Sequence, residues 1–109
     1  MPTISSLKVT IAFPYAEIAA ALGAELRQEA TRVLKNEGKP VPTDAAALSA
    51  IPTVLDSLAV VEMLMTIEPI LDCELPDRLV KTGGYTSVEE ALDHLLPRVE
   101  EHWKKKSGK

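Results

Sequence analysis

The stretch Ser57–Leu71 reads SLAVVEMLMTIEPIL and decides most of the expected fold. Its apolar residues recur every three to four positions, which is the spacing of one face of an α-helix. One stripe consists of Val60, Leu64, Ile67 and Leu71, and a neighbouring stripe consists of Leu58, Val61 and Met65. Because this apolar arc is wide, we expect a helix over residues 57–71 that lies centrally in a helical bundle.

Two further segments have the same helical pattern. Residues 15–37 carry apolar side chains at helical spacing, and Gly38 followed by Pro40 is a typical helix end. A last helix is expected to begin near Ser87, because Ser87-Val88-Glu89-Glu90 fits the capping-box pattern. The two apolar faces consist of Ile18, Leu22, Leu26, Ala30, Val33 and Leu34 in the first segment and of Val88, Leu92, Leu95 and Val99 in the last.

Proline and glycine interrupt the chain between these helices. Residues 38–55 form a long first loop with three prolines, in which Asp44 can cap a short helical turn. Residues 76–82 can form another short turn, and Gly83-Gly84 breaks the chain before the last helix. The sequence therefore predicts an all-α four-helix bundle of three main helices and one short helix, with a long first loop.

The two ends of the chain differ from this helical part. Residues 1–14 form an expected N-terminal extension, in which polar and apolar residues alternate up to Phe13. A lone extended strand is not stable, so this segment either packs on the helices or is disordered. Residues 15–105 are the expected helical domain, and residues 106–109 are an expected basic tail. A length of 109 residues is that of one domain.

The composition argues against several classes of protein. The net charge is −4, whereas nucleic-acid-binding proteins carry a basic face. The single cysteine, Cys73, excludes an intramolecular disulfide and fits a cytosolic compartment. No apolar run approaches the ~18 residues of a membrane span, and the N-terminus lacks a signal-peptide pattern. We therefore expect a monomeric cytoplasmic protein without a membrane span.

The motif that bears on chemistry is Leu55-Asp56-Ser57-Leu58, at the start of the central helix. A helix N-terminus presents unpaired N–H groups and a partial positive charge, which favour a phosphate ester on the Ser57 oxygen. Alone, the motif is better explained by Asp56 or Ser57 acting as a simple helix cap. From Asp56 to Asp77 the chain has six acidic residues and no Lys or Arg, which suits docking to basic patches.

Four segments carry a resemblance to a known family. They are Asp56-Ser57-Leu58, Val61-Glu62 with Glu68, Leu75-Pro76-Asp77, and Tyr85-Thr86-Ser87-Val88-Glu89-Glu90-Ala91-Leu92. In this order they resemble the attachment motif, the second helix, the segment after that helix and the start of the last helix of acyl carrier proteins. Val54 replaces the family's usual glycine, and Gly83-Gly84 lies in a longer loop than is usual. These departures suggest a specialised stand-alone member.

The resemblance implies a carrier without catalytic activity of its own. Ser57 would receive 4′-phosphopantetheine from coenzyme A through a phosphopantetheinyl transferase, with Asp56 and Leu58 flanking this cofactor site. The partner-docking face would include Leu58, Val61, Glu62, Met65 and Glu68. The partners would be acyl-loading and acyl-processing enzymes with basic patches, in fatty-acid, polyketide or related specialised biosynthesis. The chemistry of the acyl group would belong to the thiol of the arm.

Two other classes of function stay open. The first is an unmodified carrier-like helical adaptor that binds protein partners. The second is a hydrolase, which ranks lower because the G-x-S-x-G elbow and an α/β pattern are missing. No metal site is expected, because His94 and His102 stand eight residues apart without nearby Cys or a carboxylate pattern.

Overall fold

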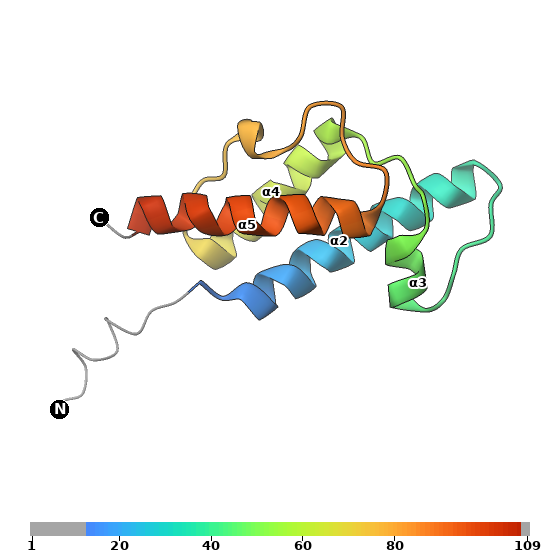
Figure 1. The fold of residues 1–109 in the computed structure, drawn as a ribbon, viewed down its shortest axis with the longest axis horizontal. Coiled ribbons are helices and arrows are strands. Elements are labelled where there is room, and N and C mark those ends of the chain that lie inside the picture. The colour runs from blue at the N-terminus through green and yellow to red at the C-terminus, as the bar shows by residue number, and fades with distance from the viewer. Residues whose placement is uncertain (1–12, 108–109) are drawn as a thin grey trace.

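The structure is a computed structural model that describes residues 13–107. Its elements are α2 (Tyr15–Asn36), α3 (Ala45–Ala50), α4 (Ser57–Leu71), the 3-10 helix η1 (Asp77–Leu79) and α5 (Val88–Ser107) (Figure 1). Residues 1–12 of the predicted extension and residues 108–109 of the predicted tail lie outside the described residues. None of the described helices is long and apolar enough to cross a membrane.

The predicted all-α class is confirmed, with three long helices and one short α-helix among the described residues. Helix α4 has the predicted bounds 57–71. The short helix α3 lies in the long first loop, where the carboxylate of Asp44 caps it by accepting a hydrogen bond from Ala47 N at 2.9 Å. The short turn expected over residues 76–82 is present as η1.

The core joins the predicted apolar stripes of the three long helices. Its fully buried members include Ile18, Leu22, Leu26, Ala30 and Leu34 of α2, Val60, Leu64 and Ile67 of α4, and Val88, Leu95 and Val99 of α5. The predicted central place of α4 is wrong, because α2 is the helix that packs against α3, α4 and α5. In the second apolar stripe of α4, Val61 is partly buried and packs against the core, whereas Leu58 and Met65 are exposed on the surface.

Helix α2 ends where the sequence predicts. Gly38 has a φ of +72°, which a residue with a side chain rarely adopts. Lys39 N donates to the carbonyl of Leu34 at 2.9 Å, and Gly38 N donates to that of Lys35 at 3.1 Å. These two bonds form a Schellman motif, which satisfies carbonyl groups at the end of the helix.

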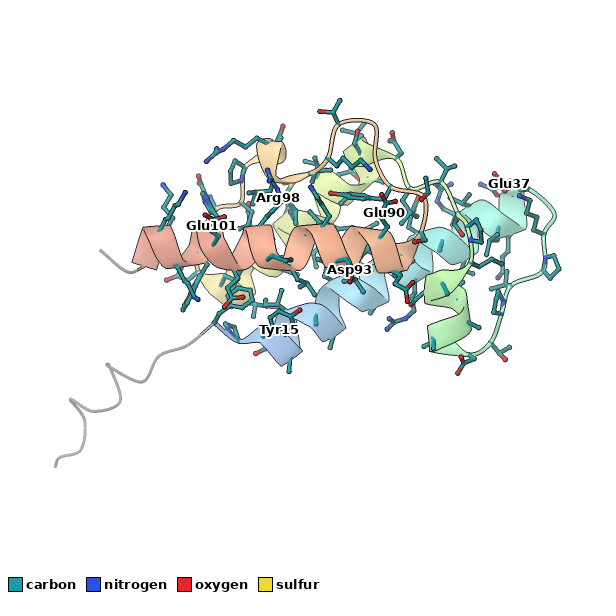
Figure 2. The ribbon with its side chains drawn as sticks, viewed as in Figure 1. Tyr15, Glu37, Glu90, Asp93, Arg98 and Glu101 are labelled. Carbon is teal, nitrogen blue, oxygen red and sulfur yellow. The ribbon has the colours of Figure 1, made fainter. Side chains whose placement is uncertain are left out.

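The middle and the C-terminal end of α5 are tied to other parts of the chain. Near its C-terminal end, Trp103 packs edge-on against the buried ring of Phe13, with 5.6 Å between the ring centroids. In the middle of the helix, Arg98 points toward η1 (Figure 2) and donates hydrogen bonds to the carbonyls of Leu79 and Arg78. The helix continues to Ser107, so its last turn includes part of the predicted basic tail.

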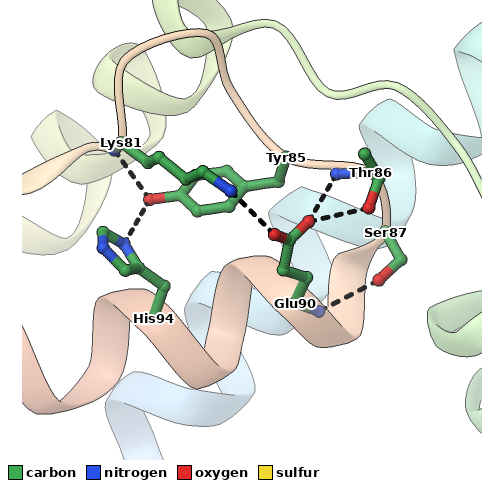
Figure 3. A network of polar contacts seen from close by, with 6 residues as sticks. All are labelled: Lys81, Tyr85, Thr86, Ser87, Glu90 and His94. Carbon is green, nitrogen blue, oxygen red and sulfur yellow. Dashed lines mark hydrogen bonds and ion pairs between the residues drawn. The ribbon is translucent and has the colours of Figure 1, made fainter.

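The start of α5 has the predicted capping box in a modified form. Ser87 Oγ accepts a hydrogen bond from Glu90 N at 3.0 Å (Figure 3). The Glu90 carboxylate accepts bonds from Thr86 N at 2.7 Å and Thr86 Oγ1 at 2.8 Å, and not from Ser87 N as in the standard box. Its second oxygen pairs with Lys81 Nζ at 2.9 Å.

These contacts predict how stability depends on pH. The Thr86 N–H, then Lys81 and the Thr86 hydroxyl, lower the pKa of Glu90 from 4.5 to about 2. A carboxyl group with a lowered folded-state pKa stabilises the fold above its unfolded pKa, and this contribution is lost as pH falls. We predict that Glu90→Gln lowers the Tm at neutral pH and reduces the fall in Tm between pH 4.5 and about 2.

Thermal melts followed by circular dichroism across this pH range measure the effect. Glu89→Gln is the matched control, because Glu89 is an exposed carboxylate in the same first turn of α5. Both substitutions remove one charge near the helix N-terminus, so their difference isolates the contacts of Glu90. Identical acid dependence of the two variants would contradict the prediction.

Candidate functional site

The candidate site lies at the first residue of α4, Ser57. Asp56 occupies the N-cap position with an extended backbone, and its carbonyl accepts the first helical hydrogen bond from Val60 N at 3.1 Å. The Asp56 side chain is exposed and makes no capping hydrogen bond in the described structure. The interpretation of Asp56 as a simple helix cap therefore lacks the hydrogen bond that a cap requires.

Backbone pairing fixes the segment that leads into Ser57. Leu55 N donates to Tyr85 O at 2.8 Å, and Tyr85 N donates to Leu55 O at 3.0 Å. Thr53 N adds a third bond, to Thr86 O at 2.7 Å. The loop before α4 is therefore held against the loop before α5, and the two loops run side by side in Figure 1.

Gly84 brings the two loops into close contact. It is buried and has a φ of +84°. A Cβ atom at this position would overlap the carbonyl oxygen of Leu55 and would lie 3.1 Å from Ser57 N. The sequence indicated Gly83-Gly84 only as a chain break. The structure shows an ordered turn, in which Gly84 N donates to Lys81 O at 3.0 Å.

Tyr85 anchors the same loop through its buried side chain. Its hydroxyl oxygen accepts a bond from Lys81 N at 2.9 Å and lies 2.7 Å from His94 Nδ1 (Figure 3). Burial raises the pKa of Tyr85. Burial, with the positive charges of Arg98 and Lys81, lowers the pKa of His94. When His94 is neutral with its proton on Nε2, Nδ1 accepts a hydrogen bond from the Tyr85 O–H.

Exposed apolar side chains flank Ser57 in the sequence and continue two turns along α4. Val54 is 67% exposed, Leu58 65% and Met65 59%. Asp72 is the only non-glycine residue with a positive φ in the described part of the chain, so the backbone at Val54 does not require glycine. The difference from the family at this position therefore affects the surface next to Ser57, since Val54 adds an exposed apolar side chain there.

The predicted docking residues of α4 lie along two different grooves. Glu62 is exposed and lines a groove between α4 and α2. Val61, Met65 and Glu68 line a second groove, between α4, residues 74–78 and the end of α5. Glu62 and Glu68 are six residues apart, which separates them by roughly 120° around the helix axis. The structure does not bring these two acids onto one face.

The two acids also differ in their contacts. Glu68 Oε2 accepts a hydrogen bond from Leu75 N at 2.8 Å, which ties the segment after α4 back onto the helix. Glu62 takes part in no ion pair among residues 13–107. Glu62 is therefore the acid with a carboxylate free for a partner, whereas Glu68 has a structural contact that the sequence did not indicate.

Comparison of the chain with known protein families, with curated proteins and with solved structures finds no significant match. The chemistry available to the site therefore follows from its own residues. Ser57 offers a hydroxyl group at a helix N-terminus, where backbone N–H groups and the helix dipole stabilise a phosphate. Within the described residues, no three His, Cys, Asp or Glu side chains are grouped as a metal site would be.

Sequence reasoning missed the roles of Gly84 and Tyr85. Two successive glycines followed by a tyrosine do indicate a turn with positive φ. The contact of that turn with Leu55 joins segments far apart in the sequence, and no local pattern reports such a contact.

The Tyr85 hydroxyl provides a test of this arrangement. We predict that Tyr85→Phe lowers the free energy of unfolding by about 1 kcal/mol, the net value of a typical hydrogen bond. Chemical denaturation followed by circular dichroism measures the change. Tyr15→Phe is the control, because Tyr15 is 50% exposed, and it should change stability little. Equal losses in both variants would show that the contacts of Tyr85 with Lys81 and His94 do not stabilise the loop.

Proposed function

We propose that this chain is a carrier protein that holds 4′-phosphopantetheine on Ser57 and an acyl or related group as a thioester on that arm. The observation that carries the proposal is the position of Ser57 at a helix N-terminus where the Asp56 side chain makes no cap. The N–H groups of the first turn are then available to the phosphate of the arm. In the transfer, Ser57 Oγ attacks the phosphorus of the coenzyme A diphosphate that bears pantetheine. The Oγ–P bond forms as the P–O–P bond breaks, adenosine 3′,5′-bisphosphate leaves, and the serine proton passes to a base of the transferase.

The surface around Ser57 supports docking of partner enzymes. Leu58 and Met65 are exposed apolar side chains on α4, and contiguous exposed apolar surface is typical of interaction sites. From Asp56 to Asp77 the chain carries no Lys or Arg, so the charges on α4 itself are all negative and attract basic patches. Arg78 and Lys106 line the groove beside Met65 and Glu68, so the uninterrupted negative charge belongs to α4 and not to that whole groove. A phosphopantetheinyl transferase and acyl-loading or acyl-processing enzymes of fatty-acid, polyketide or related biosynthesis are the partners that this surface would suit. The chain would itself catalyse no reaction.

An unmodified helical adaptor is the second candidate function. The same exposed Leu58 and Met65 favour it, because they would bind a partner whether or not Ser57 is modified. The two candidates differ in one chemical respect, which is the covalent bond at Ser57.

Mass spectrometry after incubation with coenzyme A and a phosphopantetheinyl transferase separates them. We predict that the wild-type chain gains one phosphopantetheine and that Ser57→Ala gains none. The Ala variant stays folded, since the loss of a cap costs at most about 1 kcal/mol in typical cases. Ser87→Ala, at the start of α5, is the matched control and should be modified as the wild type is.

Two results would count against the assignment. A gain of mass by Ser57→Ala would place the modification elsewhere. A wild-type chain that stays unmodified with transferases of broad specificity would favour the adaptor.

A second prediction concerns electrostatic steering by Glu62. We predict that Glu62→Lys slows transfer to Ser57, reduces the dependence of the rate on salt and leaves the Tm nearly unchanged. Exposed charges act mainly on the encounter rate and are screened beyond about 10 Å at 0.1 M salt. Transfer rates measured over a range of salt concentrations test this.

Glu101→Lys is the matched control for charge. Glu101 has a side chain that is 70% exposed, and its surface ion pair with Lys105 at 3.8 Å contributes little to stability. It lies far along α5 from Glu90 in Figure 2, and so far from the helix start that follows the loop in contact with Ser57. The substitution changes the net charge by the same amount as Glu62→Lys does. Equal slowing by both variants would mean that only net charge matters and that this part of α4 is not the docking surface.

A further inference from the structure

The loop before α5 contacts the backbone at Ser57, although the two segments are distant in the sequence. Gly84 is the point of closest approach, since a Cβ atom there would lie 3.1 Å from Ser57 N and would overlap Leu55 O. We propose that Gly84 is a positioning residue for group transfer to Ser57. The proposal rests on the proposed function of Ser57 as the attachment site, and it concerns how that serine is held.

The geometry explains why the serine needs support from another loop. No side chain of Asp56 caps the start of α4, so the usual local device for fixing a first helical turn is missing there. Leu55, two residues before Ser57, is instead bonded through both its N–H and its carbonyl to Tyr85. The Leu55 side chain is fully buried, so this part of the loop is held by its backbone and by its side chain together.

Gly84 is required because the pairing needs two backbones in close contact. Tyr85 N reaches Leu55 O at 3.0 Å only if the preceding residue passes over that carbonyl without a side chain. A residue with a Cβ would force the loops apart at Leu55 and Ser57. The hydroxyl oxygen of Ser57 would then shift relative to the phosphorus atom that it attacks.

A shift of this kind acts on the rate of transfer more than on binding. Displacement of reacting groups by about 1 Å can lower a rate by about 100-fold. Gly84 is buried behind the pairing, so its replacement adds nothing to the exposed surface that a transferase would contact. We therefore expect kcat for modification of Ser57 to fall, with KM for coenzyme A unchanged.

Gly83 provides a matched control in the same turn. Its φ is +92°, similar to that of Gly84, but nothing lies within 4 Å of the position of a Cβ atom. Gly83→Ala therefore has the backbone strain of a positive φ without the steric overlap. The difference between Gly84→Ala and Gly83→Ala isolates the contact with Leu55 and Ser57.

The experiment measures kcat and KM for modification of Ser57 in the wild type, Gly84→Ala and Gly83→Ala, below the Tm of each. We expect kcat of Gly84→Ala to be about tenfold or more below that of Gly83→Ala. Amide hydrogen exchange is the second readout, and the N–H groups of Leu55 and Tyr85 should exchange faster in Gly84→Ala alone. If the alanine variant does not fold, Leu55→Val and Leu48→Val form the replacement pair, with the same kcat and exchange measurements. Leu55→Val removes one methylene from the buried side chain and loosens the loop before α4 without placing a Cβ at residue 84, and Leu48 is a buried leucine of α3.

The outcomes separate the two proposals. Normal modification of the wild type with equal kcat values in the two glycine variants would overturn the positioning role and leave the attachment site intact. A fall in kcat with no change in hydrogen exchange at Leu55 and Tyr85 would also overturn it. A wild-type chain that accepts no phosphopantetheine would overturn the proposed function, and the positioning role with it.

Discussion

The paired backbones of Leu55 and Tyr85 are the constraint on which the placement of the candidate site depends. Helices α4 and α5 each pack on α2, so α2 alone would set their faces but not the position of their first residues. The pairing joins the two loops that enter these helices, and Gly84 allows the loops to approach closely enough for it to form. The position of Ser57 is in this way linked to the start of α5.

The apolar side chains of α4 lie in two different environments. One apolar stripe of the helix is buried against the core, and two members of the other stripe, Leu58 and Met65, are left on the surface. Full burial of such a side chain would stabilise a protein by about 1.5–3 kcal/mol. The exposed Leu58 and Met65 do not contribute this stabilisation. Exposed apolar residues near a half-buried serine, on a helix without Lys or Arg, suit a carrier that docks to partner enzymes.

Local sequence patterns predicted the helices because the interactions that begin and end each helix are local. Gly38 ends α2 through its own positive φ, and Ser87 begins α5 through a bond to a residue three positions ahead. The patterns failed where the cause lies in a distant segment. The apolar width of α4 did not reveal that α2 would take the central place, and the acidic character of Glu68 did not reveal its bond to Leu75 N. The approach of Gly84 to Leu55 belongs to the same class, since it depends on the completed fold.

The attachment of phosphopantetheine to Ser57 is tested most directly on protein isolated from the cells that produce it. Its intact mass is measured, and the segment around Ser57 is analysed by peptide mapping. If Ser57 is the attachment site, the peptide that contains it carries a phosphopantetheine group, either free or with a thioester-linked cargo. The mass of the cargo would also identify the class of group that the protein carries. An unmodified Ser57 peptide, from protein isolated from cells in which the partner enzymes are active, would contradict the assignment of Ser57 as the attachment site.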